Sequence, residues 1–328
     1  MQYLTLREED AYFIRMSENG YPLPIDFALT LAHVIALQRD SVFYHPDSER
    51  DDVNPPGKNW PQAFYKLHPE LKIKRLKALD WERHDHHIYD KLVHWFTMIG
   101  RELAGPRFKN YNIYNMDETG VLLSVLNGLK CLVSALEARN YWGAAVKRTL
   151  STAIECISDN GFSLLPMIIW PASTHRATWT THPTPGWHFA LQESGYTDTE
   201  ISFEWLMRVF HPQTVTRANG EAWLLISDGF GTHESAEIQR FAYENNIILA
   251  CLGSHTSHVC QPCDVGSFCA LKTYYRQEVK KLFRGGSKTI QKAHFTLLYN
   301  RARQKAFKGA NVCGGWKNML QITATVAQ

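Results

Sequence analysis

"YNMDETG", residues 114 to 120, closes a short apolar run with two acids, Asp117 and Glu118. The run predicts a buried strand that ends at Asp117. A carboxylate at the edge of a core costs several kcal/mol unless it is paired or used. Asp117 therefore either caps a turn closed by Gly120 or belongs to a site that other residues complete.

The rest of the chain predicts a mixed α/β sheet flanked by helices. Asp159-Asn160-Gly161 is a strong turn signal between two β-rich runs, which we expect to pair as antiparallel strands. The run AWLLISD is continuously apolar, as is typical of a strand buried on both faces. In order, the predicted segments after residue 120 are strands at 149–158 and 162–170, a helix at 199–210, a strand at 222–228, a helix at 234–246, a strand at 247–252 and a helix at 264–283. This order predicts a ribonuclease-H-like fold.

Two further acids lie where this fold would bring them beside Asp117. Asp228 ends the strand at 222–228, and Asp264 begins the helix at 264–283. The first and fourth strands are neighbours in such a sheet, so we expect the three carboxylates to converge. Acids at one edge raise one another's pKa unless a divalent cation lies between them, and all-oxygen ligands favour magnesium or manganese over zinc. Taken singly, Asp228 also fits a turn and Asp264 a helix N-cap.

Composition limits the class of protein. A chain of 328 residues with 45% apolar content can form one large core and a smaller domain, and a net charge of +3 does not by itself indicate nucleic acid. Seven scattered cysteines and an N-terminus without an apolar signal region favour a reducing compartment. The longest apolar runs are too short to span a bilayer. The sequence holds no P-loop, G-x-G-x-x-G or G-x-S-x-G motif, which disfavours a nucleotide cofactor and a serine hydrolase.

The N-terminal region predicts short helices and a basic surface. The segment 59–71 places Trp60, Phe64 and Leu67 at helical spacing, and it fits either a helix-turn-helix unit or an ordinary helical bundle. A longer apolar stripe at 86–103 predicts a helix that connects two domains. Basic side chains expected to contact DNA phosphates are Lys66, Lys72, Lys74 and Arg75 in this region and Lys272 and Arg276 in the last predicted helix.

Several separate blocks resemble one family. IYNMDETG, LLISDGFGTHES and HTSHVCQPCDVGSFCALKTYYRQE are similar to the three catalytic blocks of DDE-type transposases of the pogo branch in the mariner superfamily. PPGKNWPQAFYKLHPELK resembles the centromere-protein-B-type helix-turn-helix of that family. The resemblance extends from about Arg7 to Phe283, and the 35 residues between Asp228 and Asp264 are a typical spacing.

The resemblance implies a nuclear enzyme that binds double-stranded DNA, with a homodimer as a candidate state. Asp117, Asp228 and Asp264 would hold two magnesium or manganese ions for DNA cleavage and strand transfer, whereas Glu118 is not one of the three. The implied domains are a helix-turn-helix unit at 1–80, a connecting helix at 81–110, a ribonuclease-H-like domain at 111–285 and a C-terminal helical tail at 286–328.

The sequence departs from the family pattern at several positions. Phe230 stands where the family has a histidine, and Cys260 and Cys263 stand where it has leucines. The family also carries a further helix-turn-helix upstream of the one in this chain, and the C-terminus retains only a trace of the usual Trp-Lys ending. We expect poor sequence preference on DNA without the upstream unit.

Two alternatives remain. In the first, the acids are relics, and the protein binds DNA through its helix-turn-helix without catalysis. In the second, His255, His258, Cys260 and Cys263 hold zinc. Those four ligands are crowded into nine residues, so we expect the two cysteines to pack as small apolar side chains instead. His233, His255 and His258 fit structural roles as well as positioning of water or DNA.

Overall fold

The computed structural model describes residues 110–123, 150–174, 184–228, 235–252, 261–284 and 292–326. It also describes shorter pieces at 14, 32–33, 56–57, 59–67, 69, 71, 95, 97, 99–100, 176, 179 and 182. The fold given below is that of these residues.

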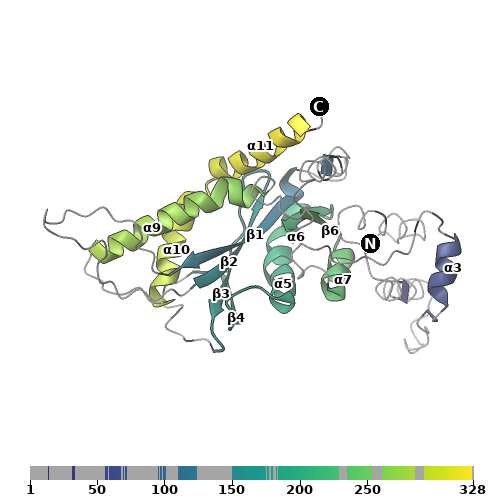
Figure 1. Cartoon of the computed structure of the whole chain (residues 1–328), viewed down its shortest axis with the longest axis horizontal. Coiled ribbons are helices and arrows are strands. Elements are labelled where there is room, and N and C mark those ends of the chain that lie inside the picture. The colour runs from purple at the N-terminus through teal and green to yellow at the C-terminus, as the bar shows by residue number, and fades with distance from the viewer. Residues whose placement is uncertain are drawn as a thin grey trace, which may run out of the picture.

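Six strands form one mixed sheet in the order β4-β3-β2-β1-β5-β6 (Figure 1). The strands are β1 (Ile113–Leu122), β2 (Leu150–Ser158), β3 (Met167–Pro171), β4 (His188–Gln192), β5 (Trp223–Asp228) and β6 (Ile247–Leu252). β2 is antiparallel to both β1 and β3, whereas β5 is parallel to β1 and β6 is parallel to β5. An antiparallel β2 beside a central β1, with two parallel strands on its other side, is the ribonuclease-H-like arrangement, so the predicted fold is confirmed.

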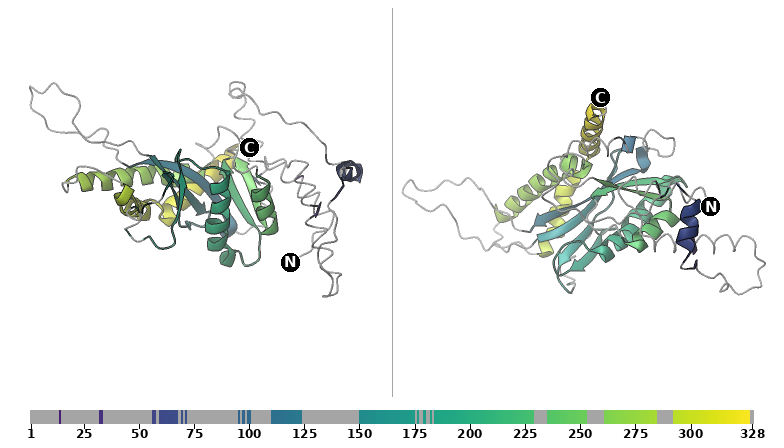
Figure 2. Two further views of the ribbon diagram at one scale, coloured as in Figure 1. Left: turned by 90° about the horizontal axis from the view of Figure 1, so that it is seen from below. Right: turned by 45° about the vertical axis from the view of Figure 1, so that its right-hand side comes forward.

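Helices cover both faces of this sheet (Figures 1 and 2). One face carries α5 (Thr199–Trp205), η5 (Leu206–Phe210), α6 (His211–Ala218) and α7 (Ala236–Glu244). The other carries η7 (Cys263–Phe268), α9 (Cys269–Arg284), α10 (Lys292–Ala306) and α11 (Gly309–Val326). Each face has its own buried apolar cluster. Burial on both faces explains why β5 and β6 are almost wholly apolar.

β1 is longer than predicted. It continues through Asp117 to Leu122, and β2 pairs with it along this whole length. The prediction that the strand ends at Asp117 is therefore wrong, because Thr119 and Val121 are also buried and continue the alternation of faces. Asp117 lies within a paired strand, opposite Glu155, and does not close a turn.

β4 was missed by the sequence reasoning. It lies at the edge of the sheet, parallel to β3, after a loop rich in Pro and Thr. Trp187, Phe189 and Leu191 all pack against the same apolar cluster. This alternation with a period of two was the signal that could have revealed the strand.

Helices beyond α9 also contribute to the core. Phe295, Tyr299 and Ala302 of α10 are fully buried, as are Val312 and Met319 of α11. α10 and α11 thus pack in the same apolar cluster as α9. The predicted domain boundaries stay predictions.

Few residues before 110 are described. Trp95 and Ile99 are helical, one turn apart and buried, and the Trp95 indole N–H donates to the carbonyl oxygen of Cys251 in β6 over 2.7 Å. α3 (Trp60–Leu67) is a helix in which Trp60 stacks on Phe64 at 4.7 Å between ring centroids. Leu67 lies at the end of this helix and is 77% exposed, so it is not buried with Phe64.

Candidate active site

Pairing of β1 with β5 sets Asp117 beside Asp228. The recorded pairs join Ile113, Tyr114 and Asn115 to Leu224, Leu225 and Ile226. The same offset, continued for two residues along both strands, places Asp117 level with Asp228. The first and fourth strands predicted from the sequence correspond to β1 and β5. The prediction that they lie side by side is therefore confirmed.

Both carboxylates point to the face that carries η7. Side chains alternate along a strand, and Ile113 and Val121 of β1 belong to the apolar cluster on that face, as do Leu224 and Ile226 of β5. Asp117 is an even number of positions from Ile113 and Val121, and Asp228 is an even number from Leu224 and Ile226, so both acids lie on that face. Glu118 lies on the opposite face of β1 and is exposed.

η7 brings the third acid to this face. Asp264 lies in the first turn of η7 and is half-buried. The preceding residue, Cys263, is anchored to β1, because its backbone N–H donates to the side-chain oxygen of Asn115 over 2.9 Å. Acids from β1, β5 and η7 thus meet at the carboxyl-terminal end of β5, on the face that carries η7.

The three carboxylates repel one another. Asp117 is 7% exposed, and desolvation, followed by the charges of Asp264 and Asp228, raises its pKa well above the usual value. A hydrogen bond of 2.7 Å from the Glu118 N–H acts in the opposite direction. Desolvation and then the charge of Asp264 also raise the pKa of Asp228. Each acid is close enough to disfavour ionisation of another, which is the pattern expected of a cation site.

The chemistry of this donor set fits a magnesium or manganese ion. All three donors are carboxylates, the ligand type that these hard cations prefer. Among the described residues, no three His, Cys, Asp or Glu side chains are close enough to hold one ion as they stand. Binding would therefore draw the carboxylates together as the cation offsets their repulsion.

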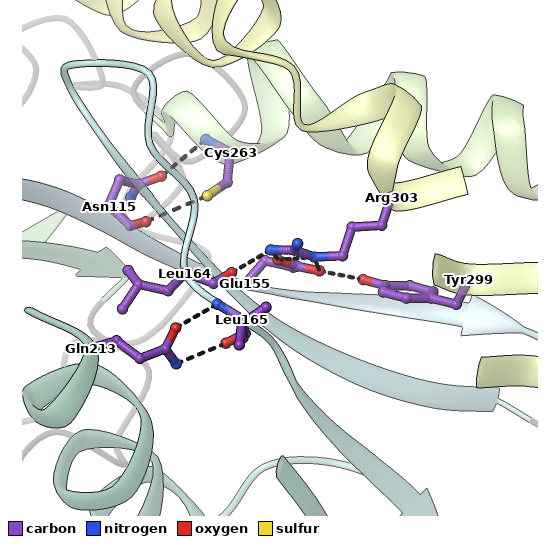
Figure 3. Close-up of polar contacts among 8 residues, drawn as sticks. All are labelled: Asn115, Glu155, Leu164, Leu165, Gln213, Cys263, Tyr299 and Arg303. Carbon is purple, nitrogen blue, oxygen red and sulfur yellow. Dashed lines mark hydrogen bonds and ion pairs between the residues drawn. The ribbon is translucent and has the colours of Figure 1, made fainter. Parts of the chain in front are cut away.

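A second buried acid lies next to Asp117 on the same face of the sheet. Glu155 is fully buried and directly opposite Asp117 in the β1–β2 ladder. Its carboxylate accepts bonds from Arg303 at 2.8 and 3.0 Å (Nε) and 2.8 Å (Nη2), and from the Tyr299 hydroxyl at 2.8 Å (Figure 3). Arg303 Nη2 also donates to the Leu164 carbonyl. Glu155 is therefore compensated by a cation of the chain itself, whereas Asp117 has no such ion pair with any residue that the structure describes.

The predicted phosphate contacts lie partly within the described chain. Lys272 and Arg276 are exposed and one turn apart on α9, and Lys66 is exposed in the last turn of α3. Lys72, Lys74 and Arg75 lie outside the described residues. Lys281, also on α9, is paired with Glu278 at 2.9 Å.

Cys263 packs as predicted. It is fully buried in the apolar cluster beneath Asp264. Burial, followed by the charge of Asp117, raises the pKa of its thiol well above the usual value, which favours a neutral thiol over the thiolate that zinc requires. Cys260, His233, His255, His258 and Phe230 lie outside the described residues.

Asn115 is the residue of this site that sequence reasoning missed. It is fully buried in the strand that carries Asp117, and its side chain bonds to both β5 and η7. The signal was present, because a buried amide inside an apolar run must find hydrogen-bond partners. Sequence alone could not say which segments supply them.

These features define a ribonuclease-H-like protein with three acids at one edge of its sheet. Residues 147–316, just over half of the chain, match the family model of the DDE superfamily endonucleases. The chain belongs to this family, as its sequence motifs predicted. The match extends through α10 into α11, which agrees with the burial of both helices in the core.

A relative found by sequence comparison aligns with only part of this chain and with a smaller part of its own length. The chain is 30% identical over 209 residues to the "MFS-type transporter clz9" of Cochliobolus lunatus, an alignment that spans 63% of this chain and 22% of that protein. In the part of the chain that the structure describes, no helix is long and apolar enough to cross a membrane.

Solved structures of Mos1 transposase are similar at low identity. The pre-cleavage Mos1 transpososome aligns at 10% identity and a TM-score of 0.47, over 88% of this chain and 84% of that one. The mariner Mos1 paired-end complex with magnesium aligns at 10% identity and a TM-score of 0.47, over 89% and 86%.

Proposed function

We propose that this chain is a transposase-type enzyme that cleaves DNA phosphodiester bonds with magnesium or manganese and joins the cut strand to a new site. The observation that carries the proposal is the approach of Asp117, Asp228 and Asp264 to one sheet edge, where each opposes the ionisation of another. Membership of the DDE superfamily endonucleases supports the same reaction class.

Each acid has a distinct task in this proposal. Asp117 and Asp228 supply ligands from adjacent strands, and Asp264 supplies one from η7. Magnesium or manganese held by these acids would supply activation of a water or a 3′-hydroxyl and stabilisation of the departing oxygen in an in-line displacement. Burial of Asp117 keeps its carboxylate poorly solvated, which strengthens its attraction to a cation.

The remaining parts of the chain have proposed roles in binding. Lys272 and Arg276 would hold the DNA backbone beside the acids, and residues 1–80 would bind duplex DNA as a helix-turn-helix unit. A homodimer is the working state that we propose for this chain. A nuclear location is part of the same proposal.

Nicking of supercoiled plasmid by the purified chain tests the proposal. We expect nicking that requires magnesium or manganese and that is abolished in Asp117→Asn, Asp228→Asn and Asp264→Asn. Asp159→Asn is the matched control, because Asp159 is also half-buried and burial alone raises its pKa; it should nick like wild type.

Two results would contradict the enzyme. One is a folded wild-type protein that retains DNA but never nicks it with either metal, which would leave the alternative of a DNA-binding protein derived from a transposase. The other is metal-dependent nicking that all three Asp→Asn variants retain, which would indicate a contaminating nuclease.

A further inference from the structure

Asn115 is a buried amide at the centre of the candidate site. It precedes Asp117 by two residues in β1, points to the same face and is fully buried. Burial of an unpaired amide is costly, so its bonds hold it in one orientation.

The Asn115 side chain joins the three segments that carry the acids. Its Nδ2 donates to the carbonyl oxygen of Ile226 in β5 over 3.1 Å, and its Oδ1 accepts from the N–H of Cys263 in η7 over 2.9 Å. Figure 3 shows the contact with Cys263. The Cys263 thiol also reaches the Asn115 backbone carbonyl, at 3.5 Å.

Asparagine suits this position by its chemistry. Ile226 offers only an acceptor and Cys263 only a donor, so the bridging group needs one donor and one acceptor in a short planar unit. Leucine has a similar shape but provides neither group. Aspartate would keep the acceptor, lose the donor and add a fourth charge to the site.

We infer that Asn115 is a positioning residue that sets the spacing of the three catalytic acids. Ile226 precedes Asp228 by two residues, and Cys263 immediately precedes Asp264. If either hydrogen bond shifted, the Asp228 or Asp264 carboxylate that follows it in the chain would move as well. The inference rests on the proposed function, because the spacing matters only if the acids share cations.

Gln261 adds a second tie between the same segments. It is fully buried, and its side-chain nitrogen donates to the Met116 carbonyl oxygen at 3.5 Å. Gln261 and Cys263, which both precede Asp264 closely, are thus anchored to the strand of Asp117. Asn115 remains the residue that also reaches β5.

Direct manganese titration, followed by plasmid nicking at each manganese concentration, tests the inference in the full chain. Removing an outer partner of a metal site typically costs about 10–100-fold in affinity or activity. We expect Asn115→Leu to raise the half-saturating manganese concentration by that factor and to lower the nicking rate at saturation. A purely structural loss would reduce the fraction of active protein without moving the half-saturation point.

Thr119→Val is the matched control. Thr119 follows Asp117 by two residues as Asn115 precedes it, shares its face and is buried, and its hydroxyl makes no hydrogen bond within the described residues. It should titrate like wild type.

The outcomes separate the two claims. If wild type binds manganese and nicks DNA, and folded Asn115→Leu does both equally well, the positioning role is wrong while the proposed function stands. If wild type does neither, both claims fail. If Asn115→Leu does not fold, amide hydrogen exchange of wild type decides: we expect the Cys263 N–H to be protected, and exchange as fast as that of an exposed amide would overturn the inference.

Discussion

At the scale of single residues, Asp117 is held where its own ionisation is opposed. It is buried, it lies level with Asp228, and it faces the helix that carries Asp264. Its neighbour Glu155 shows the contrast, since Arg303 supplies that carboxylate with a cation in place. The Asp117 position is thus costly in the metal-free protein and suited to an added cation.

The metal-free protein should lose stability as pH rises, in part because of Asp117. Its folded-state pKa lies above the usual 3.8, so the folded state holds a proton that the unfolded state releases. This stabilising contribution is complete below about pH 3.8 and is lost as pH rises through the raised pKa. Urea unfolding with a chelator, from acidic to neutral pH, should show a smaller fall in the free energy of unfolding for Asp117→Asn. Parallel curves for both proteins would contradict this.

Arg303 should matter more for stability than an exposed ion pair does. Arg303→Met would leave Glu155 charged, buried and opposite Asp117, which costs about 3–5 kcal/mol when one partner of a buried pair is removed. Adding Glu155→Gln should recover part of that loss, because the unpaired charge disappears. Urea denaturation of the single and double variants measures both, and an additive loss in the double variant would argue against the pairing.

At the scale of elements, η7 is fixed against both β1 and α11. η7 and α11 cross closely where Gly266 of η7 faces Gly315 of α11. A Cβ on Gly266 would lie 2.7 Å from the Asn311 carbonyl oxygen. The contact lies two residues beyond Asp264. Close packing on one side and the Asn115 bond on the other therefore fix the start of η7.

Gly266→Ala should separate η7 from α11. Overpacking of a close contact typically costs about 1–3 kcal/mol, and the displaced helix should also weaken magnesium-dependent nicking. Gly314→Ala is the matched control, because a Cβ there meets nothing within 4 Å among the described residues. The control should be neutral or stabilising by up to about 1 kcal/mol. Equal thermal stability of the two variants would contradict the close crossing.

The elements also show what sequence could and could not predict. β5, β6 and α9 were predictable, because long apolar runs and helical stripes are local signals. The end of β1 was not, because pairing with β2 carries the strand past two acids that would otherwise suggest a turn. The roles of Asn115, Glu155 and Arg303 depend on contacts between residues more than 100 positions apart, which no local pattern specifies.

At the scale of the whole molecule, acids and basic side chains belong to the same face of the sheet. α9 continues directly from η7, so its exposed Lys272 and Arg276 follow Asp264 along one helical run. A DNA backbone held there would lie near the acids. Helices α5 to α7, on the other face, serve the core and not this surface.

Lys272→Ala and Arg276→Ala should each weaken DNA binding without a change in sequence preference. Removing one phosphate contact should lower the slope of log affinity against log salt by about 1. Arg208→Ala is the control, because Arg208 is exposed on η5 of the opposite face and paired with Glu204 at 2.8 Å. Fluorescence anisotropy over a salt series measures the slopes, and three identical slopes would refute the proposed contact surface.

Anomalous diffraction from crystals grown with manganese would reveal whether Asp117, Asp228 and Asp264 share divalent cations. We predict an anomalous peak bounded by the carboxylates of Asp117 and Asp228, with Asp264 completing the ligand set, and no peak there in Asp228→Asn crystals. Manganese bound elsewhere in wild-type crystals, with no peak at these three acids, would show that they do not form the metal site.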